Sequence, residues 1–256
     1  MESEFVDQLG ERIHLTGIPK RIISLVPSQT ELLYDLGLDQ EVAGITKFCV
    51  HPDSWFKKPK VGGTKDLWFD RIDELLPDLI IGNKEENDFE SIEKLKARYP
   101  VWMSDIITLE DALNMILALG AITRKESNAE KINHGIREAF GALKTKAPHR
   151  VLYLIWKDPW MGAGKGTFID AMLAEMGLTN CLEQMRYPEL TDRNLEQLAP
   201  DIILLSSEPY PFKGKHVSEL QHLIPAAKIM LVNGQMFSWY GSRLMQAPVY
   251  FNSLPF

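Results

Sequence analysis

Short apolar runs alternate with amphipathic helical segments in the first part of the chain. Residues 21–25 form an apolar, β-rich run. After Pro27, the segment Ser28-Gln29-Thr30-Glu31 is typical of a capping box that begins a helix ending at Gly37. Further strands are predicted over 42–45, 79–81 and 101–103, and helices over 70–76 and 88–98. Because strands alternate with helices, we predict a mostly parallel sheet covered on both faces.

The middle of the chain has no strand signal. From Leu109 to about Lys146, apolar residues recur at helical spacing, namely Leu113, Ile116, Ala121, Ile132, Ile136 and Phe140. The part that begins at Thr123 is long enough for a helix of about 20 residues, or roughly 30 Å at the helical rise. Pro148 ends this segment. We therefore predict one long linking helix over 123–147.

The pattern of the first part returns after Pro148. Residues 150–155 match the run at 21–25, and Pro200-Asp201 before an apolar strand repeats Pro77-Asp78. Chance similarity between two βα units is the alternative explanation. The repeat predicts an α/β protein with two lobes, each a mostly parallel sheet flanked by helices. Their predicted bounds are 1–122 for the N-terminal lobe, 123–147 for the linking helix and 148–256 for the C-terminal lobe.

The segments that follow the predicted strands are rich in aromatic and polar residues. In open α/β sheets, ligands bind beyond the carboxyl ends of the strands. Four of the six Trp residues fall at such ends or in loops, namely Trp68, Trp156, Trp160 and Trp239. Large flat side chains suit a broad, partly apolar ligand. The alternative is that these rings close the ends of the two cores.

Composition and charge exclude several classes of protein. The 256 residues are 45% hydrophobic and 25% charged, as expected for a globular chain, and the formal net charge of -7 disfavours nucleic acid as a partner. No run approaches the ~18 apolar residues of a membrane helix, and residues 1–5 lack the features of a signal peptide. We therefore expect a chain that is not exported as given, with its compartment left open. Cys49 and Cys181 have no metal-ligand spacing and are expected to be separate thiols.

Several charged residues are candidates for chemistry at the strand ends. Lys47, Lys165 and Arg243 are candidate partners for a carboxylate or phosphate on a ligand. Glu85, Glu86 and Glu208 follow strands of the two lobes and are candidates for paired acid–base catalysis. No Gly-x-Ser-x-Gly, His-Glu-x-x-His or Cys-x-x-Cys motif is present, which argues against hydrolase and metalloprotease activities.

Two other groups of residues have weaker patterns. The run 162–167 departs from the spacing of a Walker motif, although backbone amides near Thr167 are candidates to hold an anionic group. His51 is a candidate metal or cobalt ligand, and Tyr34 and Tyr240 are candidate haem ligands, each with an ordinary loop or surface residue as the alternative. We predict no intrinsic metal site and no intrinsic cofactor.

Three segments together resemble a known family. They are residues 20–32 with their Pro-Ser-x-Thr-Glu motif, Val61-Gly62-Gly63, and residues 72–81 with their Pro-Asp-Leu-Ile-Ile end. They resemble the class III, helical-backbone substrate-binding proteins of ABC importers, which form periplasmic binding protein family 2. Residues 7–15 also look like the N-terminal hairpin of its iron-chelate members. The resemblance extends over nearly the whole chain.

The resemblance implies a monomeric, non-catalytic protein that binds cobalamin, haem or a ferric siderophore in a cleft between two lobes and delivers it to a permease. It implies ligand contacts at Phe48, near Trp68, in the 156–160 loop and at Trp239. With the polar candidates, the predicted ligand-binding set is Lys47, Phe48, Trp68, Glu85, Trp156, Trp160, Glu208, Trp239, Tyr240 and Arg243.

The resemblance also bears on the partner and the compartment. It implies permease docking through Asp70, whereas the matching stretch at 213–216 is basic. The family implies a periplasmic location. The alternatives are a cytoplasmic homologue that acts as an enzyme or sensor, using Lys47 with Glu85 or Glu208, and a protein-interaction module without a ligand.

Overall fold

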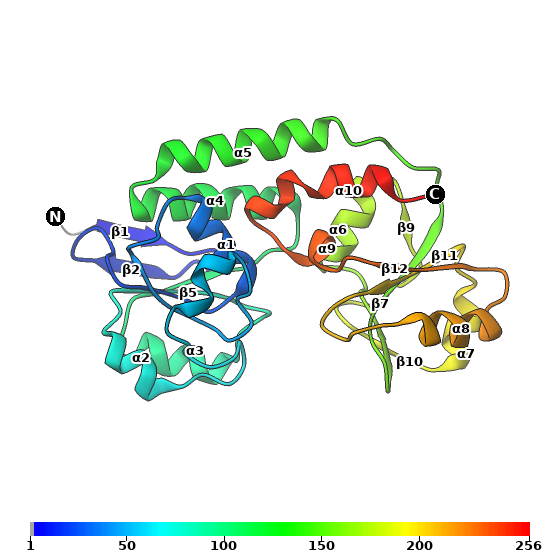
Figure 1. Cartoon of the computed structure of the whole chain (residues 1–256), viewed down its shortest axis with the longest axis horizontal. Helices are drawn as coiled ribbons and strands as arrows, with labels where there is room; N and C mark the ends of the chain where they lie inside the picture. The colour runs from blue at the N-terminus through cyan, green and yellow to red at the C-terminus, as the bar shows by residue number, and fades with distance from the viewer. Residues whose placement is uncertain (1–2) are drawn as a thin grey trace. The chain divides into compact units, whose positions relative to one another are not determined.

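The computed structural model describes residues 3–256, which form two compact units. The first unit comprises Met1–Ile106, Glu110–Glu138 and Trp239–Met245, and the second comprises Ile107–Leu109, Ala139–Ser238 and Gln246–Phe256. Each unit contains a mostly parallel sheet flanked by helices (Figure 1). The predicted α/β fold class is therefore confirmed. The segment 239–245 was predicted to lie in the C-terminal lobe, but its contacts assign it to the first unit.

The sheet of the first unit has four parallel strands in the order β4-β3-β5-β6. The strands are β3 (Ile22–Ser24), β4 (Val42–Ile45), β5 (Leu79–Asn83) and β6 (Val101–Ser104). The helices between them are α1 (Pro27–Asp35), η1 (Asp53–Lys57), α2 (Phe69–Leu75) and α3 (Phe89–Lys96). On one face, Ile23 and Ile80 pack against Ile72 of α2 and Ile92 of α3. The four strands and the helices α2 and α3 lie where the hydrophobic pattern predicts them, whereas η1 was not predicted.

The N-terminal hairpin and a pair of helices complete the first unit. Strands β1 (Ser3–Val6) and β2 (Arg12–Leu15) are antiparallel. The predicted helix over 123–147 is wrong in its bounds, because α4 (Leu109–Thr123) and α5 (Glu126–Gly141) are separate helices that lie side by side (Figure 1). The chain turns at Arg124, which has a φ of 58°. The division between the two units falls inside α5, after Glu138.

The sheet of the second unit has the order β10-β8-β7-β11-β12, with β9 paired to β7. Its strands are β7 (Arg150–Trp156), β8 (Trp160–Gly162), β9 (Thr179–Asn180), β10 (Glu189–Leu190), β11 (Ile202–Ser206) and β12 (Lys228–Val232). Its helices are α6 (Phe168–Glu175), α7 (Asp192–Leu198), α8 (Gly214–Leu223), α9 (Gln235–Ser238) and α10 (Ala247–Ser253). Between α9 and α10 lies the 3-10 helix η2 (Ser242–Met245), which is part of the first unit. Strand β8 pairs antiparallel with both of its neighbours, β7 and β10. The pairs β7–β9, β7–β11 and β11–β12 are parallel.

The internal repeat extends to individual hydrogen bonds. Helices α2 and α7 both end at a residue with left-handed backbone, Leu76 (φ 47°) and Ala199 (φ 43°). In each unit, a Pro-Asp dipeptide follows. The carboxylate of Asp78 accepts a hydrogen bond from the backbone N–H just before β3 (2.8 Å), and that of Asp201 accepts one from the first residue of β7 (2.7 Å). This shared detail favours an internal repeat over chance similarity between two βα units.

The predicted capping box of α1 is wrong. The helix begins one residue earlier, with Pro27 in its first turn and Val26 as the N-cap residue, and no side chain caps it. Proline is favoured at this position because its missing N–H would have no partner there. Ser28 therefore lies inside the helix, and the carboxylate of Glu31 pairs with a residue from the far end of the chain.

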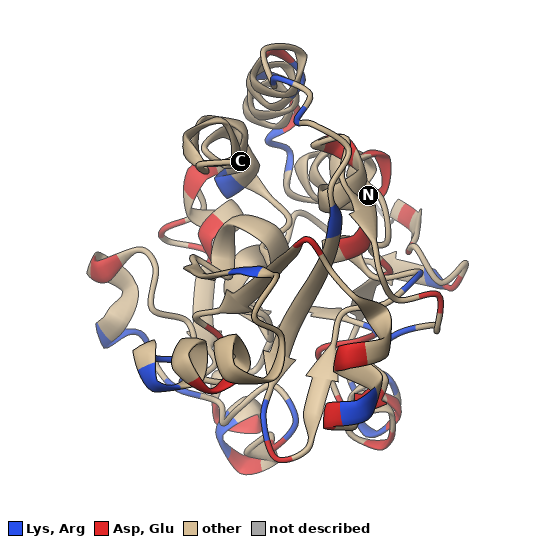
Figure 2. Ribbon diagram, turned by 90° about the vertical axis from the view of Figure 1, so that its right-hand side faces the viewer, with Lys and Arg blue, Asp and Glu red and all other residues tan. Residues whose placement is uncertain are grey.

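The surface carries both signs of charge. Figure 2 shows Lys and Arg interspersed with Asp and Glu along the helices and loops that face the viewer. No large region of one sign is visible in this view. Within residues 3–256, the helices are all too short or too polar to cross a membrane.

Candidate functional site

The carboxyl ends of the strands in the first unit are joined by a buried polar network. The side-chain amide of Gln29 donates to Ser104 Oγ (2.7 Å) and to the carbonyl oxygen of Gly82 (3.1 Å). The amide of Asn87 donates to the carbonyl oxygens of Thr64 (2.9 Å) and Leu25 (3.4 Å). Breaking such buried bonds is costly, because the remaining donor or acceptor loses its partner away from water. The network therefore holds the ends of β3, β5 and β6 in a defined arrangement.

Lys47 and Phe48 follow β4 at the same end of this sheet. The backbone N–H of Lys47 donates to the carbonyl oxygen of Gly62 (2.8 Å), which ties this loop to the hairpin at 62–67. The Phe48 ring is 53% exposed, and the Lys47 ammonium lies 5.3 Å from its centroid. Lys47 forms no ion pair within the described part of the chain. Two residues of the predicted ligand-binding set thus form one cationic and aromatic surface.

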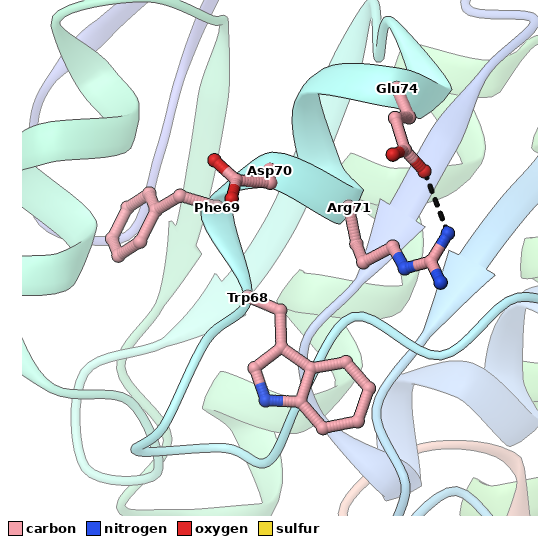
Figure 3. Close-up of a pocket in the computed structure, with 5 residues that line it drawn as sticks. All are labelled: Trp68, Phe69, Asp70, Arg71 and Glu74. Atoms are coloured by element: carbon pink, nitrogen blue, oxygen red, sulfur yellow. Dashed lines mark hydrogen bonds and ion pairs between the residues drawn. The ribbon is translucent and has the colours of Figure 1, made fainter.

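Trp68 and Asp70 line a shallow hollow at the start of α2 (Figure 3). The hollow has a volume of about 660 Å³, and its other lining residues are Phe69, Arg71 and Glu74. The Trp68 side chain is 44% exposed. Arg71 and Glu74 form an ion pair (2.8 Å), and Asp70 points away from it (Figure 3). The predicted docking residue Asp70 therefore shares one hollow with the predicted ligand contact Trp68.

Arg243 and Trp239 form a packed cluster in the first unit. The Arg243 guanidinium donates from Nε and Nη2 to the two carboxylate oxygens of Glu31 (2.8 and 2.6 Å). The guanidinium also lies 4.7 Å from the centroid of the Trp239 ring, and the His51 ring meets Trp239 edge-on at 5.7 Å. Trp239 and its neighbour Tyr240 are only 7% and 5% exposed. The reason for predicting Arg243 as an anion partner is removed, because Glu31 already neutralises its charge.

The second unit has one exposed and one buried tryptophan at the end of β7. Trp156 is 39% exposed and meets Tyr210 edge-on at 5.4 Å. Trp160 is 6% exposed, stacks on Phe212 at 6.2 Å, and donates from Nε1 to Asp192 (3.0 Å). For Trp160, the structure favours the alternative given by the sequence, because this ring packs in the hydrophobic core of the second unit.

The candidate carboxylates lie in different units. Glu85 is in the turn after β5, where its backbone N–H donates to Asn83 Oδ1 (2.8 Å). Glu208 follows β11, and its Oε1 accepts a hydrogen bond from Ser238 Oγ (3.3 Å). Across residues 3–256, no three His, Cys, Asp or Glu side chains gather in a group that could hold a metal ion.

Two local expectations have clear outcomes. The start of α6 is capped by a side chain of the protein itself, because Thr167 Oγ1 accepts a hydrogen bond from Asp170 N (3.1 Å). The Asp170 carboxylate also pairs with Lys165 (3.4 Å). An anionic ligand group at this position is therefore disfavoured. Cys49 and Cys181 are separate buried thiols, as predicted, and burial raises the pKa of each.

Sequence reasoning missed two residues of the site. Glu31 was assigned to a cap, because its true partner Arg243 is 212 positions away in the sequence. Gly63 was noted only as part of a motif, but it supports the side chains of Lys47 and Phe48. The paired glycines at 62 and 63 were the available signal, since glycine often marks a close approach of other atoms to the backbone.

Two units with mostly parallel sheets flanked by helices define a two-unit α/β protein. A family model described as "Periplasmic binding protein" matches residues 22–225. The chain belongs to this periplasmic binding protein family, which confirms the resemblance found in the sequence. The family consists of binding proteins.

Known relatives cover nearly the whole chain. The vitamin B12-binding protein of Pectobacterium atrosepticum is 25% identical over 243 residues, which cover 90% of this chain and 86% of that protein. The structure of the periplasmic vitamin B12 binding protein BtuF of Vibrio cholerae has a TM-score of 0.82 and 20% identity, covering 93% of this chain and 97% of that one. The periplasmic heme-binding protein RhuT from Roseiflexus sp. RS-1 has a TM-score of 0.78 and 22% identity, with coverages of 92% and 98%. These structures share the fold.

Proposed function

We propose that this chain is a substrate-binding protein that binds a metal chelate of the corrinoid or haem class and delivers it to the permease of an ABC importer. It binds the chelate without converting it. The observation that carries the proposal is the exposure of Phe48, just after β4, and of Trp68, just before α2, in a chain of the periplasmic binding protein family.

The exposure of the aromatic side chains supports a bulky, flat ligand. Phe48 is 53% exposed, Trp68 44% and Trp156 39%, and each lies beyond or near the carboxyl end of a parallel strand. Such rings lose little rotamer entropy on binding and offer a large contact area. The relatives named for vitamin B12 and heme bind ligands that are flat macrocycles around a metal. A binding role is thus better supported than a catalytic role for Lys47 with Glu85 or Glu208.

The permease and the compartment belong to the same proposal. Asp70 lies at the hollow beside Trp68 and is the candidate docking residue for a cationic permease surface. The family description supports action in the periplasm or an equivalent space outside the cytoplasmic membrane. We propose that the protein acts as a monomer.

A binding panel tests the proposal. Purified protein is titrated with cyanocobalamin, haemin and a ferric hydroxamate siderophore, and quenching of Trp fluorescence and the change in ligand absorbance are recorded. We expect saturable binding of one macrocycle. We also expect that Trp68→Ala weakens this binding by about tenfold, since loss of one aromatic contact typically costs on the order of 1–2 kcal/mol.

The control variant is Ile18→Ala. Ile18 is 54% exposed and precedes β3, at the amino ends of the strands, so its removal should leave the affinity unchanged. The proposal fails if none of the three chelates binds. The role of Trp68 fails if both variants bind like the parent protein.

A further inference from the structure

Gly63 has little room for a side chain of its own. A Cβ added at Gly63 would lie 3.0 Å from Phe48 Cε2 and 3.3 Å from Lys47 Cε. Both neighbouring side chains therefore lie directly over the backbone of Gly63. Its φ is outside the left-handed region, so this backbone conformation does not itself require glycine. The close approach of Lys47 and Phe48 is therefore what favours glycine here.

The two side chains over Gly63 differ in what they offer a ligand. Phe48 presents an exposed ring, whereas Lys47 presents an ammonium group that is 5.3 Å from the centroid of that ring. Within residues 3–256, no carboxylate forms an ion pair with Lys47. By contrast, Arg243 in the same unit is neutralised by Glu31. Of the three predicted cations, Lys165 pairs with Asp170 and Arg243 with Glu31, so Lys47 is the one whose charge is left for a ligand.

We propose that Gly63 positions Phe48 and Lys47 as one surface, and that this surface selects a flat chelate with a carboxylate at its edge. This inference rests on the proposed function. The Lys47 ammonium lies over the Phe48 ring, 5.3 Å from its centroid, so a macrocycle that stacks on the open part of this ring has its rim beside the ammonium. An acidic group at that rim then reaches Lys47. An ammonium and a carboxylate form a charge-assisted hydrogen bond, which a neutral amide or ester forms less well. The ligand class is therefore a porphyrin with free propionates, or a corrinoid with a free side-chain acid.

Matched ligand pairs measure this selectivity. Haemin is compared with its dimethyl ester, and cyanocobalamin with its monocarboxylic acid derivative, in which one amide has been hydrolysed. The measured quantity is the ratio of the two dissociation constants in each pair. For the parent protein, we expect the acid to bind about three- to tenfold more tightly than its neutral partner, as for a partly exposed charged hydrogen bond.

Variants of the surface locate the effect. Lys47→Met should reduce the ratio to about one while neutral chelates still bind, and Lys47→Arg should restore the preference. Gly63→Ala should weaken binding of both members of a pair and also reduce the ratio, because the added methyl group displaces Phe48 and Lys47 together. The matched control is Gly17→Ala, since a Cβ at Gly17 would meet no atom within 4 Å.

Each outcome decides one of the two proposals. If no chelate binds the parent protein, both the proposed function and this inference are overturned. If chelates bind but the ratio is the same in the parent and in Lys47→Met, the function stands and the inference is overturned. If Gly63→Ala binds like Gly17→Ala, the positioning role of Gly63 is overturned. Melting temperatures of all the variants show whether any loss of binding comes from unfolding.

Discussion

Breaking the ion pair between Glu31 and Arg243 on one side only is expected to destabilise the first unit. The two side chains are 15% and 10% exposed, and the guanidinium lies over the Trp239 ring at 4.7 Å. Replacing one partner of a buried pair leaves the other charge uncompensated, which typically costs about 3–5 kcal/mol. The lost cation–π contact adds about 0.5–1 kcal/mol, and the residual exposure reduces the total. We expect Arg243→Met to lower the free energy of unfolding by about 3 kcal/mol.

A double-mutant cycle separates the pair from its surroundings. The parent, Glu31→Leu, Arg243→Met and the double variant are unfolded in urea and followed by Trp fluorescence, which reports on Trp239 among the other Trp residues. In the double variant no charge is left unpaired, so we expect it to regain most of the stability lost in Arg243→Met. The coupling energy should exceed the stability that the double variant regains, because Glu31→Leu alone also leaves one charge uncompensated.

A surface pair in the same unit serves as the control. Arg137 also contacts both carboxylate oxygens of its partner Glu110, at 3.0 Å each, but both side chains are 58% exposed. Exposed pairs contribute roughly 0.2–1 kcal/mol, so Arg137→Met should have a small effect. The reasoning is refuted if Arg243→Met and Arg137→Met cost the same, or if the double variant is no more stable than Arg243→Met.

Two further predictions concern the second unit. His216 is 2% exposed, its Nδ1 accepts from Lys213 N (2.9 Å), and burial is the main cause that lowers its pKa from 6.5. As pH falls below 6.5 the unfolded chain takes up a proton first, so stability should fall by up to about 1.4 kcal/mol per pH unit. Urea titrations from pH 7 to 5 should show a weaker pH dependence in His216→Asn, and equal slopes would contradict this. Asp201→Ala should cost about 1 kcal/mol through loss of its bond to Arg150 N, whereas Asp201→Asn should cost less in the same assay.

Much of the first sheet could be predicted because its signals are local. The run at 21–25, the strand before Asn83 and the Pro-Asp dipeptides predicted the strands and the repeat, and the repeat is present in the hydrogen bonds of Asp78 and Asp201. Placing Phe48 just after a strand and Trp68 in a loop followed from the same pattern, and both side chains are exposed. The start of α1 was predicted one residue too late. The segment Ser28-Gln29-Thr30-Glu31 has the residues of a capping box, but the helix begins with Pro27 in its first turn and has no side-chain cap.

The alternation of strands and helices in the first unit and the outline of the internal repeat were determined by the sequence alone, because alternating hydrophobicity, glycine and proline act over a few neighbouring residues. The family followed from the motifs at 20–32, 61–63 and 72–81. Three features were decided only by the tertiary structure: Trp160 packs in a core, Trp239 lies in the first unit, and Glu31 is the partner of Arg243. Each depends on residues that are distant in the sequence. No local pattern specifies such pairs, since they form only when separate segments bury their surfaces together.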